Sequence, residues 1–413
     1  MTRAREKPNP PQPPEPKVYH QRIQVSFDYP VYFARDVFVA GNPLLASAID
    51  RLHEGRRQRA MVAVDAGLAS AQPQLLGRIK EYFHARPQAL ELSAGPALVP
   101  GGEAAKNDWQ NVRDIMWSAG NAHLDRQSVV IAVGGGAVLD MVGFAASIVH
   151  RGLRVLRVPS TTLAQADAGV GVKTGMDEHG QKNFVGTFAP PFAVVNDFAL
   201  LATLPQRDWI GGVAEAFKVA LIKDAAFFEF LCVRAGALRA RDSAAMEESI
   251  RRCAVLHLEH IASGGDPFET GSARPLDFGH WSAHKIETLS GYAVGHGQAA
   301  AIGVALDSCY AARTGLLSEA DLDRILEALT ACGLPIWHET IARRTADGRL
   351  AILDGLEEFR EHLGGTLTIT LPDGIGRKLQ VRHMNPDLID QAAAWLGNRN
   401  SLTTKDTKST KKS

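Results

Sequence analysis

The hydrophobic pattern of this 413-residue chain changes once, near Leu204 and Pro205. From about residue 22 to residue 200, short runs rich in β-branched residues alternate with stretches of helical period. Such alternation predicts parallel strands covered by helices. After Pro205 long helical periods dominate, and a strand-and-turn pattern interrupts them at 367–376. The pattern therefore predicts an α/β domain followed by an α-helical domain.

The two ends of the chain lack this patterning. Residues 1–17 are rich in proline and charge, and residues 398–413 form a polar, lysine-rich tract. Neither segment carries enough apolar surface to order itself, so we expect both to be disordered. The rest of the chain divides into residues 18–204 and residues 205–397, one predicted domain each.

Charge and composition exclude several classes of protein. Lys and Arg total 45 and Asp and Glu total 45, so no net basic field attracts nucleic acid or an acidic membrane. The most apolar stretch, 128–149, contains the run Gly134–Gly136 and Asp140, and it is typical of strand, loop and helix rather than a membrane span. The N-terminus has no secretory pattern, and the four cysteines form no CxxC pair. We therefore expect a cytoplasmic small-molecule enzyme with no nucleic-acid or membrane partner.

Three consecutive glycines, Gly134–Gly136, follow one apolar run and precede a helical one. A backbone without side chains can approach a phosphate group at the positive end of a helix, which favours a dinucleotide site. The spacing is not GxGxxG, so a simple tight turn is the alternative. Asp65 follows the apolar run MVAV, where an acidic residue can accept ribose hydroxyls or form a turn.

A glycine-rich stretch at 159–188 carries Asp167, Lys173, Lys182 and Asn183 among small residues. We expect this stretch to be a loop held against a ligand. Two lysines and an amide suit a phosphorylated, polyhydroxylated substrate. The alternative is a surface loop with solvated lysines.

The helical half contains candidate metal ligands. Glu215 lies three residues before Lys218 in an apolar segment, His280 and His284 are four apart, and His296 follows in a glycine turn. One Glu and two His from separate helices supply the ligand set of a catalytic zinc, with a position left open for substrate. A Glu–Lys salt bridge and buried core histidines are the alternatives.

Taken in order, the motifs resemble those of the 3-dehydroquinate synthase family of sugar-phosphate cyclases. The resemblance covers roughly residues 60–300 and includes PGGEAAKND, GGGAVLDMVGFAASIVHRG, PSTTLAQADAGVGVKTG, GQKNFVGTF, GGVAEAFK, FGHWSAH and GHG. It implies a Rossmann-like NAD-binding domain, an all-α metal-binding domain, an active site between them and a homodimer.

The resemblance also implies roles for individual residues. The residues that it assigns to NAD are Asp65, Glu103, Lys106, Gly135, Gly136, Asp140, Ser160 and Thr161. The residues that it assigns to Zn²⁺, or to Co²⁺, are Glu215, His280 and His296. The residues that it assigns to substrate and catalysis are Asp167, Lys173, Lys182, Asn183, Lys218, His284 and Arg151. Asp277 is added to this set as a site residue that departs from the family pattern. In the family, the arginine that matches Arg151 reaches phosphate across the dimer interface.

The family chemistry implies a cyclisation without net redox change. NAD transiently oxidises a ring hydroxyl of a ketose phosphate, phosphate is eliminated, the hydride returns, and an intramolecular aldol reaction closes the carbocycle. The enzyme class implied is a carbon–oxygen lyase acting on a phosphorylated sugar.

Two positions that bear on the substrate depart from the 3-dehydroquinate synthase pattern, and Val172 also replaces a glycine of that pattern. Ala273 and Asp277 stand where that pattern has arginine and asparagine. A carboxylate in a partly desolvated site repels an acidic substrate. The sequence therefore favours a substrate like sedoheptulose 7-phosphate over the carboxylate-bearing precursor of 3-dehydroquinate. The alternatives are a 3-dehydroquinate synthase in which Arg274 binds the carboxylate, an NAD-dependent polyol or alcohol dehydrogenase of the same superfamily, and a non-catalytic binding protein.

Overall fold

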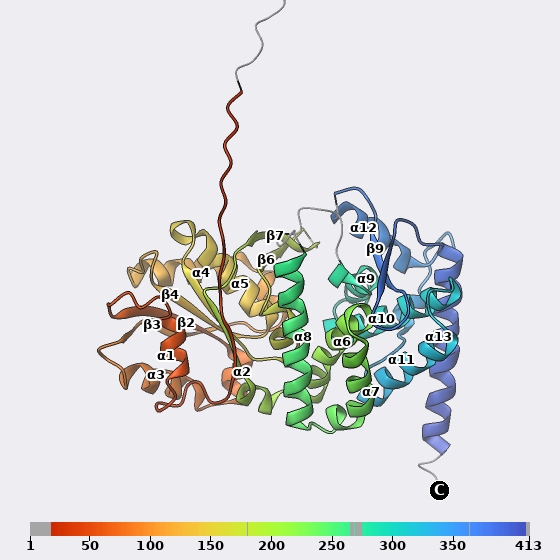
Figure 1. The fold of residues 1–413 in the computed structure, drawn as a ribbon, viewed down its shortest axis with the longest axis horizontal. Coiled ribbons are helices and arrows are strands. Elements are labelled where there is room, and N and C mark those ends of the chain that lie inside the picture. The colour runs from red at the N-terminus through yellow and green to blue at the C-terminus, as the bar shows by residue number, and fades with distance from the viewer. Residues whose placement is uncertain (1–17, 180, 265–267, 269–274, 363, 410–413) are drawn as a thin grey trace, which may run out of the picture.

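The computed structural model describes residues 18–179, 181–264, 268, 275–362 and 364–409 (Figure 1). Its N-terminal half is built on a six-stranded sheet in which all the paired strands run parallel. The strands, in their order across the sheet, are β1 (Val31–Ala34), β8 (Ala193–Asp197), β5 (Arg154–Pro159), β4 (Val129–Gly134), β2 (Gln58–Asp65) and β3 (Leu90–Val99). The predicted α/β architecture is confirmed.

Helices cover both faces of this sheet. The helices of this half are α1 (Leu44–Ile49), α2 (Ala66–Ala71), α3 (Leu75–His84), α4 (Trp109–Asn121) and α5 (Gly136–Ile148). One buried cluster joins α1 and α3 to one side of the strands, and a second joins α4 and α5 to the other. Strands buried on both faces explain why β2 and β4 are continuous apolar runs rather than alternating ones.

The glycine-rich stretch forms a hairpin where the sequence predicts a loop. Strands β6 (Lys173–Glu178) and β7 (Gln181–Phe188) pair antiparallel in a sheet of their own. Gly175 and Gly186 face each other across the pair, and a Cβ at Gly186 would stand 2.4 Å from the carbonyl oxygen of Thr174. The glycines therefore allow a close contact between two strands, where the sequence predicted a loop held against a ligand.

Helices dominate the second half, as predicted. They are α6 (Gln206–Lys223), α7 (Ala225–Arg239), α8 (Ser243–Ser263), α9 (His280–Leu289), α10 (His296–Arg313), α11 (Glu319–Cys332), α12 (Asp354–His362) and α13 (Pro386–Ser409). The strand-and-turn pattern near 367 becomes the hairpin β9 (Ile369–Pro372) and β10 (Lys378–Val381). Helices α6 and α10 lie at the centre of one large apolar cluster.

Local sequence explains where several helices begin. Asp108, Asp224, Asp242 and Ser318 stand directly before α4, α7, α8 and α11, and each side chain accepts a hydrogen bond from a first-turn backbone N–H. Such caps satisfy donors that a helix leaves unbonded at its start. The boundaries of these helices are therefore set by single polar residues.

The C-terminal helix differs from its prediction. The sequence predicts an irregular tail from residue 398, but α13 continues through Ser409. Buried Ile389, Ala392 and Leu396 anchor the first turns of the helix, and a nucleated helix adds one hydrogen bond for each further residue. The predicted tail at 1–17 and the last four residues, 410–413, lie outside the described residues.

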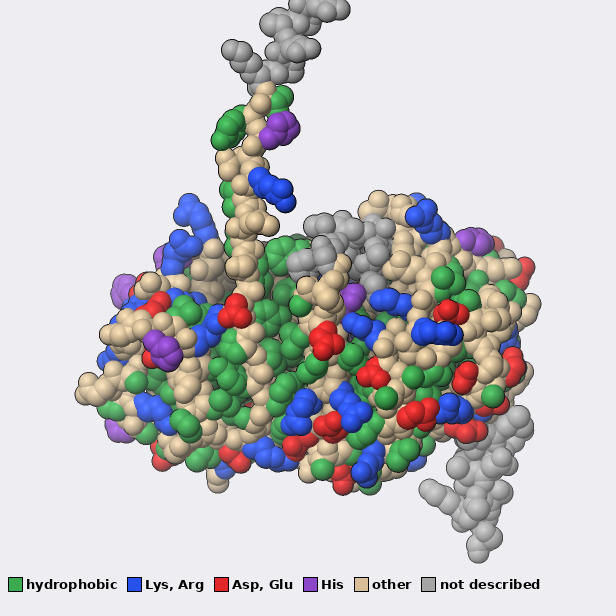
Figure 2. All heavy atoms as spheres, viewed as in Figure 1, with side chains coloured by type: hydrophobic (Ala, Val, Ile, Leu, Met, Phe, Trp, Pro, Cys, Tyr) green, Lys and Arg blue, Asp and Glu red, His purple; other side chains and the backbone are tan. Residues whose placement is uncertain are grey.

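The surface charge and the helices bear on two classes that the sequence analysis excludes, nucleic-acid-binding proteins and membrane proteins. Figure 2 shows acidic and basic side chains interspersed over the face in view, without a broad patch of one sign. Within the described part of the chain, none of the helices combines the length and apolar character needed to span a bilayer.

Candidate active site

Glycine contacts bring three helices of the second half close together. A Cβ at Gly297 of α10 would stand 2.5 Å from the Cα of Gly211 on α6. A Cβ at Gly303 of α10 would stand 2.0 Å from the carbonyl oxygen of Gly279, which precedes α9 and has a φ of +77°. Only residues without side chains permit these crossings. The crossings place Glu215 on α6 next to the N-terminal ends of α9 and α10.

The three predicted metal ligands converge at this crossing. Nε2 of His280 lies 3.5 Å and Nε2 of His296 lies 3.3 Å from Oε1 of Glu215, and one ligand atom from each residue fits within a span of 4.8 Å. His296 opens α10 rather than lying in the turn before it. The Glu215 carboxylate is fully buried, and neither of its oxygens has a hydrogen bond of normal geometry. Because Oε1, the oxygen of this buried carboxylate that faces the two imidazoles, needs a partner, this donor set fits a divalent cation such as Zn²⁺.

The Glu215–Lys218 salt bridge considered from the sequence is also present. Nζ of Lys218 lies 2.5 Å from Oε2 of Glu215 and 3.6 Å from Oδ1 of Asp167, which lies in the short π-helix η3 (Ala164–Ala168). Although burial opposes it, the charges of Asp167 and Glu215 hold the pKa of Lys218 above its usual value. Lys218 is therefore a buried cation beside the metal-ligand set.

Asp167 has a second basic neighbour, His257 of α8. Nδ1 of His257 lies 2.7 Å from Oδ1 of Asp167. Burial raises the pKa of Asp167, but Lys218 and His257 outweigh it and keep that pKa well below its usual value. Asp167 is thus an ionised acceptor that joins α6 and α8 to the end of the sheet.

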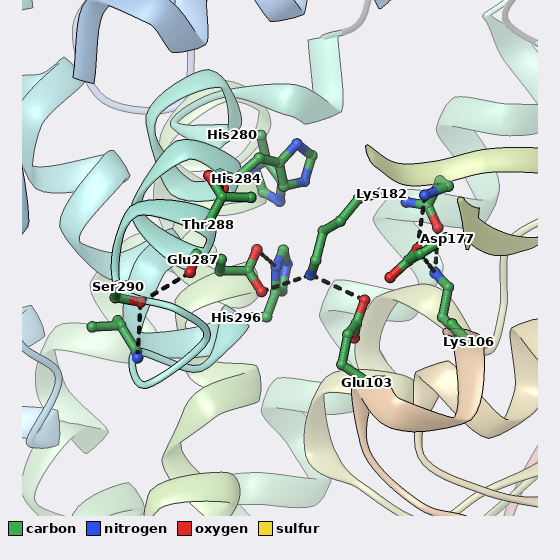
Figure 3. Close-up of polar contacts among 12 residues, drawn as sticks. Glu103, Lys106, Asp177, Lys182, His280, His284, Glu287, Thr288, Ser290 and His296 are labelled. Atoms are coloured by element: carbon green, nitrogen blue, oxygen red, sulfur yellow. Dashed lines mark hydrogen bonds and ion pairs between the residues drawn. The ribbon is translucent and has the colours of Figure 1, made fainter. Parts of the chain in front are cut away.

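A chain of polar contacts links the helices to the sheet domain (Figure 3). Oε2 of Glu287 lies 3.1 Å from Nδ1 of His296, and Oε1 of Glu287 lies 2.7 Å from Nζ of Lys182 on β7. The same ammonium lies 3.1 Å from Oε1 of Glu103, in the short helix η1 (Glu103–Lys106). Burial lowers the pKa of Lys182, but Glu287 and Glu103 raise it to about 12 overall. One predicted substrate lysine therefore contacts both halves of the molecule.

The predicted cofactor and substrate residues also meet at Lys106. Its ammonium lies 3.0 Å from Oδ2 of Asp140 on α5 and 3.7 Å from Oδ1 of Asp177 on β6, and it donates to the side chain of Asn183. Asn183 has a φ of +54°, and Oδ1 of Asp177 accepts its backbone N–H at 2.9 Å. Asp177 therefore holds the turn end of the hairpin in the conformation that presents Asn183.

The carboxyl ends of the central strands carry the other predicted cofactor residues. Gly135 precedes α5, and a Cβ there would stand 3.2 Å from Cγ2 of Thr161. The backbone N–H of Ser160 donates to the carbonyl of Gly134 at 2.9 Å. Asp65 accepts hydrogen bonds from the first turn of α2, which confirms its turn-forming alternative. These residues lie at the edge where ligands bind in parallel sheets, and their contact with NAD stays a prediction.

Burial and neighbouring charge shape the surroundings of three further predicted residues, Lys173, Asp277 and His284. Arg157 of β5 is fully buried and donates to the carbonyls of Gly171 at 2.7 Å and Lys173 at 3.0 Å, which holds the backbone that carries Lys173. Burial raises the pKa of Asp277, but Lys173 and nearby basic groups lower it overall. Burial together with the charges of His280 and His296 lowers the pKa of His284 to about 3, so His284 is neutral at pH 7.

Family models and a curated relative decide the family. A model of the 3-dehydroquinate synthase N-terminal domain matches residues 96–211, and a model of its C-terminal domain matches residues 212–352. A 3-dehydroquinate synthase of Azotobacter vinelandii is 39% identical over 282 residues, which cover 68% of this chain and 75% of that protein. The chain belongs to the 3-dehydroquinate synthase family.

Solved structures agree with this family at the level of fold. The 2-epi-5-epi-valiolone synthase of Streptomyces hygroscopicus subsp. jinggangensis 5008, solved with NAD⁺ and Zn²⁺ bound, has a TM-score of 0.81 and 28% identity, and the match covers 92% of this chain and 100% of that one. A 2-deoxy-scyllo-inosose synthase complexed with carbaglucose-6-phosphate, NAD⁺ and Co²⁺ shares the fold at a TM-score of 0.69 and 22% identity, covering 88% of this chain and 95% of that one.

Several residues of this family member's site escaped sequence reasoning. They are Arg157, Asp177, His257 and Glu287. Glu287 had a usable signal, because it lies three and seven residues after His284 and His280 and so shares their helix face. Asp177 and His257 had none, because their contacts join separate elements.

The structure does not test the predictions that rest on Arg151, Ala273 and Arg274. Arg151 is exposed in the short helix η2 (Val149–Arg151), and its reach across a dimer interface stays a prediction. Ala273 and Arg274, on which the substrate argument partly depends, lie outside the described residues.

Proposed function

We propose that the protein is an NAD- and zinc-dependent sugar-phosphate cyclase acting on a ketose phosphate with a neutral head group, such as sedoheptulose 7-phosphate. The observation that carries the proposal is the convergence of Glu215, His280 and His296 beside Lys218. The Glu215 carboxylate is buried without hydrogen bonds of normal geometry and lies beside two imidazoles and the ammonium of Lys218. Together the carboxylate and the imidazoles could bind a cation. An enzyme that only transfers hydride would use the metal ligands Glu215, His280 and His296. Such an enzyme does not need Lys173, Lys182 and Lys218.

The side chains divide the work of such a reaction. When bound, NAD supplies a hydride acceptor and the metal supplies Lewis-acid polarisation. Lys173, Lys182 and Asn183 bind the phosphate and orient it for elimination, since fixed cations stabilise developing charge on a leaving group. Lys218, kept charged by Asp167 and Glu215, orients a substrate hydroxyl and is a poor proton acceptor. Neutral His284 offers a ring nitrogen for hydrogen bonding or proton transfer.

Asp277 favours a substrate whose head group carries no charge. Its lowered pKa makes it a carboxylate at neutral pH, and it is close enough to Lys218 to influence the pKa of that lysine. A substrate carboxylate placed here would meet a like charge in a partly desolvated site. The head group that fits is a hydroxymethyl ketone, which carries no charge.

The deciding experiment gives Zn²⁺-loaded protein and NAD either sedoheptulose 7-phosphate or the seven-carbon keto-acid phosphate that precedes 3-dehydroquinate. Phosphate release and the cyclic product are followed by colorimetry and mass spectrometry. We expect turnover of the neutral substrate with no net NADH. In Asp277→Asn the preference should move toward the keto acid, while the matched variant Asp373→Asn keeps the wild-type preference.

Other outcomes would replace the proposal. Turnover of the keto acid alone would make the protein a 3-dehydroquinate synthase, which is the activity named for the Azotobacter relative. Stoichiometric NADH without phosphate release would indicate a dehydrogenase. Absence of turnover with both substrates, in protein shown to bind Zn²⁺ and NAD, would favour a binding protein.

The homodimer belongs to the same proposal. If Arg151 acts across the interface, Arg151→Ala and Lys218→Met subunits are each inactive alone but form mixed dimers with one intact site. Recovery of activity on mixing and subunit exchange would support this arrangement. No recovery from dimers shown to be mixed would contradict it.

A further inference from the structure

We propose that Glu287 is a positioning residue that orients His296 toward the metal and couples the metal site to Lys182, without being a metal ligand itself. This inference rests on the proposed function. It assigns a role to a residue that sequence reasoning did not select.

The two ring nitrogens of His296 face different carboxylates. Nδ1 lies 3.1 Å from Oε2 of Glu287, and Nε2 lies 3.3 Å from Oε1 of Glu215. An ionised carboxylate accepts a hydrogen bond and cannot donate one. Glu287 therefore keeps the ring proton on Nδ1, which leaves the lone pair of Nε2 directed toward Glu215 and His280. A carboxylate on the far side of a ligating histidine fixes its tautomer and raises its basicity.

Glu287 also belongs to a second group with metal-like geometry. His284, Glu287 and His296 offer one ligand atom each within a span of 4.8 Å, so the geometry alone allows two overlapping positions for a cation. The remaining oxygen of Glu287 lies 2.7 Å from the ammonium of Lys182. That fixed positive charge opposes a cation in the second group. Only the group with Glu215 keeps a carboxylate whose oxygens lack normal hydrogen bonds.

The backbone holds Glu287 and His296 in register. Oγ of Ser290 donates to the carbonyl of Glu287 at 3.0 Å and accepts from the backbone N–H of Val294 at 3.2 Å. These bonds brace the turn between α9 and α10, as Figure 3 shows. The Glu287 side chain is only 4% exposed. Its carboxylate is thus a rigid support rather than a mobile surface group.

Lys182 extends this support toward the substrate. Its ammonium bridges Glu287 on α9 and Glu103 in η1, and Figure 3 shows the lysine reaching between the two carboxylates. A substrate phosphate would bind the ammonium that Glu287 holds in place. Loss of Glu287 should therefore change both the metal affinity and the KM for a phosphorylated substrate.

The test measures Zn²⁺ affinity by chelator competition on purified, metal-free protein. The variants are Glu287→Ala, Glu287→Gln and Glu215→Ala. The matched control is Glu358→Gln, which removes an exposed carboxylate of α12. That carboxylate lies 2.5 Å from the ammonium of Lys285, which is on α9 like Glu287. The Co²⁺ absorption spectrum reports the ligand set independently of activity.

We expect Glu287→Ala to weaken Zn²⁺ binding by about 10- to 100-fold while one metal per chain and the Co²⁺ band positions are kept. Glu287→Gln retains a carbonyl acceptor for Nδ1–H and should restore part of that affinity. It should still raise the KM, because it loses the charge that positions Lys182. Glu358→Gln should match the wild type in every measurement.

Two results would overturn the inference. Wild-type affinity and wild-type KM in folded Glu287→Ala would show that Glu287 positions nothing. Complete loss of metal in Glu287→Ala and Glu287→Gln, equal to that in Glu215→Ala, would make Glu287 a ligand. If instead Glu215→Ala binds Zn²⁺ as the wild type does, the metal assignment of the proposed function fails, and the affinities of the Glu287 variants still decide the present inference.

Discussion

The two ends of the six-stranded sheet use charged residues differently. Before the amino ends of the strands, Glu54 receives two bonds from Arg154, at 2.6 and 2.9 Å, and a third from Arg56 at 3.1 Å. On the side where the sheet meets the helices, both oxygens of Glu215 and Oδ2 of Asp177 are buried without a hydrogen bond of normal geometry, and within the described residues no other carboxylate has such an oxygen. Since buried polar groups are normally satisfied, we assign the first arrangement to stability and propose that the second binds ligands.

The sharpest test of this contrast removes one carboxylate from each end. Glu215→Gln should abolish Zn²⁺ binding and lower cyclase activity by about 10³-fold or more, because Lewis-acid stabilisation is worth several kcal/mol. Glu54→Gln should keep full activity. Activity assays and metal analysis of both variants check this result, and similar activities in the two variants would remove the functional half of the contrast.

The carboxyl ends of the sheet strands should also tolerate added side-chain volume less well than an exposed position does. A Cβ at Gly134 would stand 2.7 Å from Cβ of Val138 and 3.2 Å from Cβ of Asp65. We expect Gly134→Ala to lower the free energy of unfolding by about 1–3 kcal/mol through overpacking. Gly41→Ala, where a Cβ meets nothing within 4 Å, is the control. Urea unfolding that gave the two variants the same stability would argue against close packing at Gly134.

The amino-end pair should contribute to stability but not to activity. Arg154→Met should lower the free energy of unfolding by about 1 kcal/mol, since the pair has good two-point geometry but is partly exposed to solvent. The control is Arg344→Met, whose partner Asp390 is more exposed and which should cost less. A fall in cyclase activity in folded Arg154→Met would contradict the separation of roles.

The smallest expected effect is a pH dependence of the same pair. The hydrogen bond from Arg154 is the main cause that lowers the pKa of Glu54 from 4.5 to about 2. A lowered acid pKa gives stability that is fully present above about pH 4.5 and disappears as the pH falls toward 2. The stability difference between wild type and Arg154→Met should therefore shrink between pH 5 and pH 2. A difference that stayed constant over this range would assign the effect of Arg154 to packing.

Much of the fold could be predicted because its signals are local. Buried parallel strands such as β4 are short apolar runs, and α6 and α10 carry helical periods long enough to identify. The β6–β7 hairpin escaped because its glycines permit close pairing as well as flexibility, and composition alone does not separate the two. The extent of α13 escaped because anchoring of its first turns by tertiary packing governs how far it continues.

The candidate site was predictable only through its motifs. Glu215, His280 and His296 are named by the family resemblance, and their spacing alone left a salt bridge and core histidines as alternatives. The contacts of Glu287 with Lys182 and of Asp167 with His257 join residues 105 and 90 positions apart. No periodicity encodes such pairs, so only the packing of α8 and α9 against the sheet domain reveals them.

By itself, the sequence determined the two-part architecture, the neutral overall charge and the types of side chain available for phosphate, dinucleotide and metal, because these depend on local pattern and composition. The tertiary structure decided which carboxylates have all their hydrogen bonds and which have buried oxygens without hydrogen bonds of normal geometry. The physical reason is that the glycine crossings at Gly211–Gly297 and Gly279–Gly303 set the helix positions, and with them the distances over which charges act.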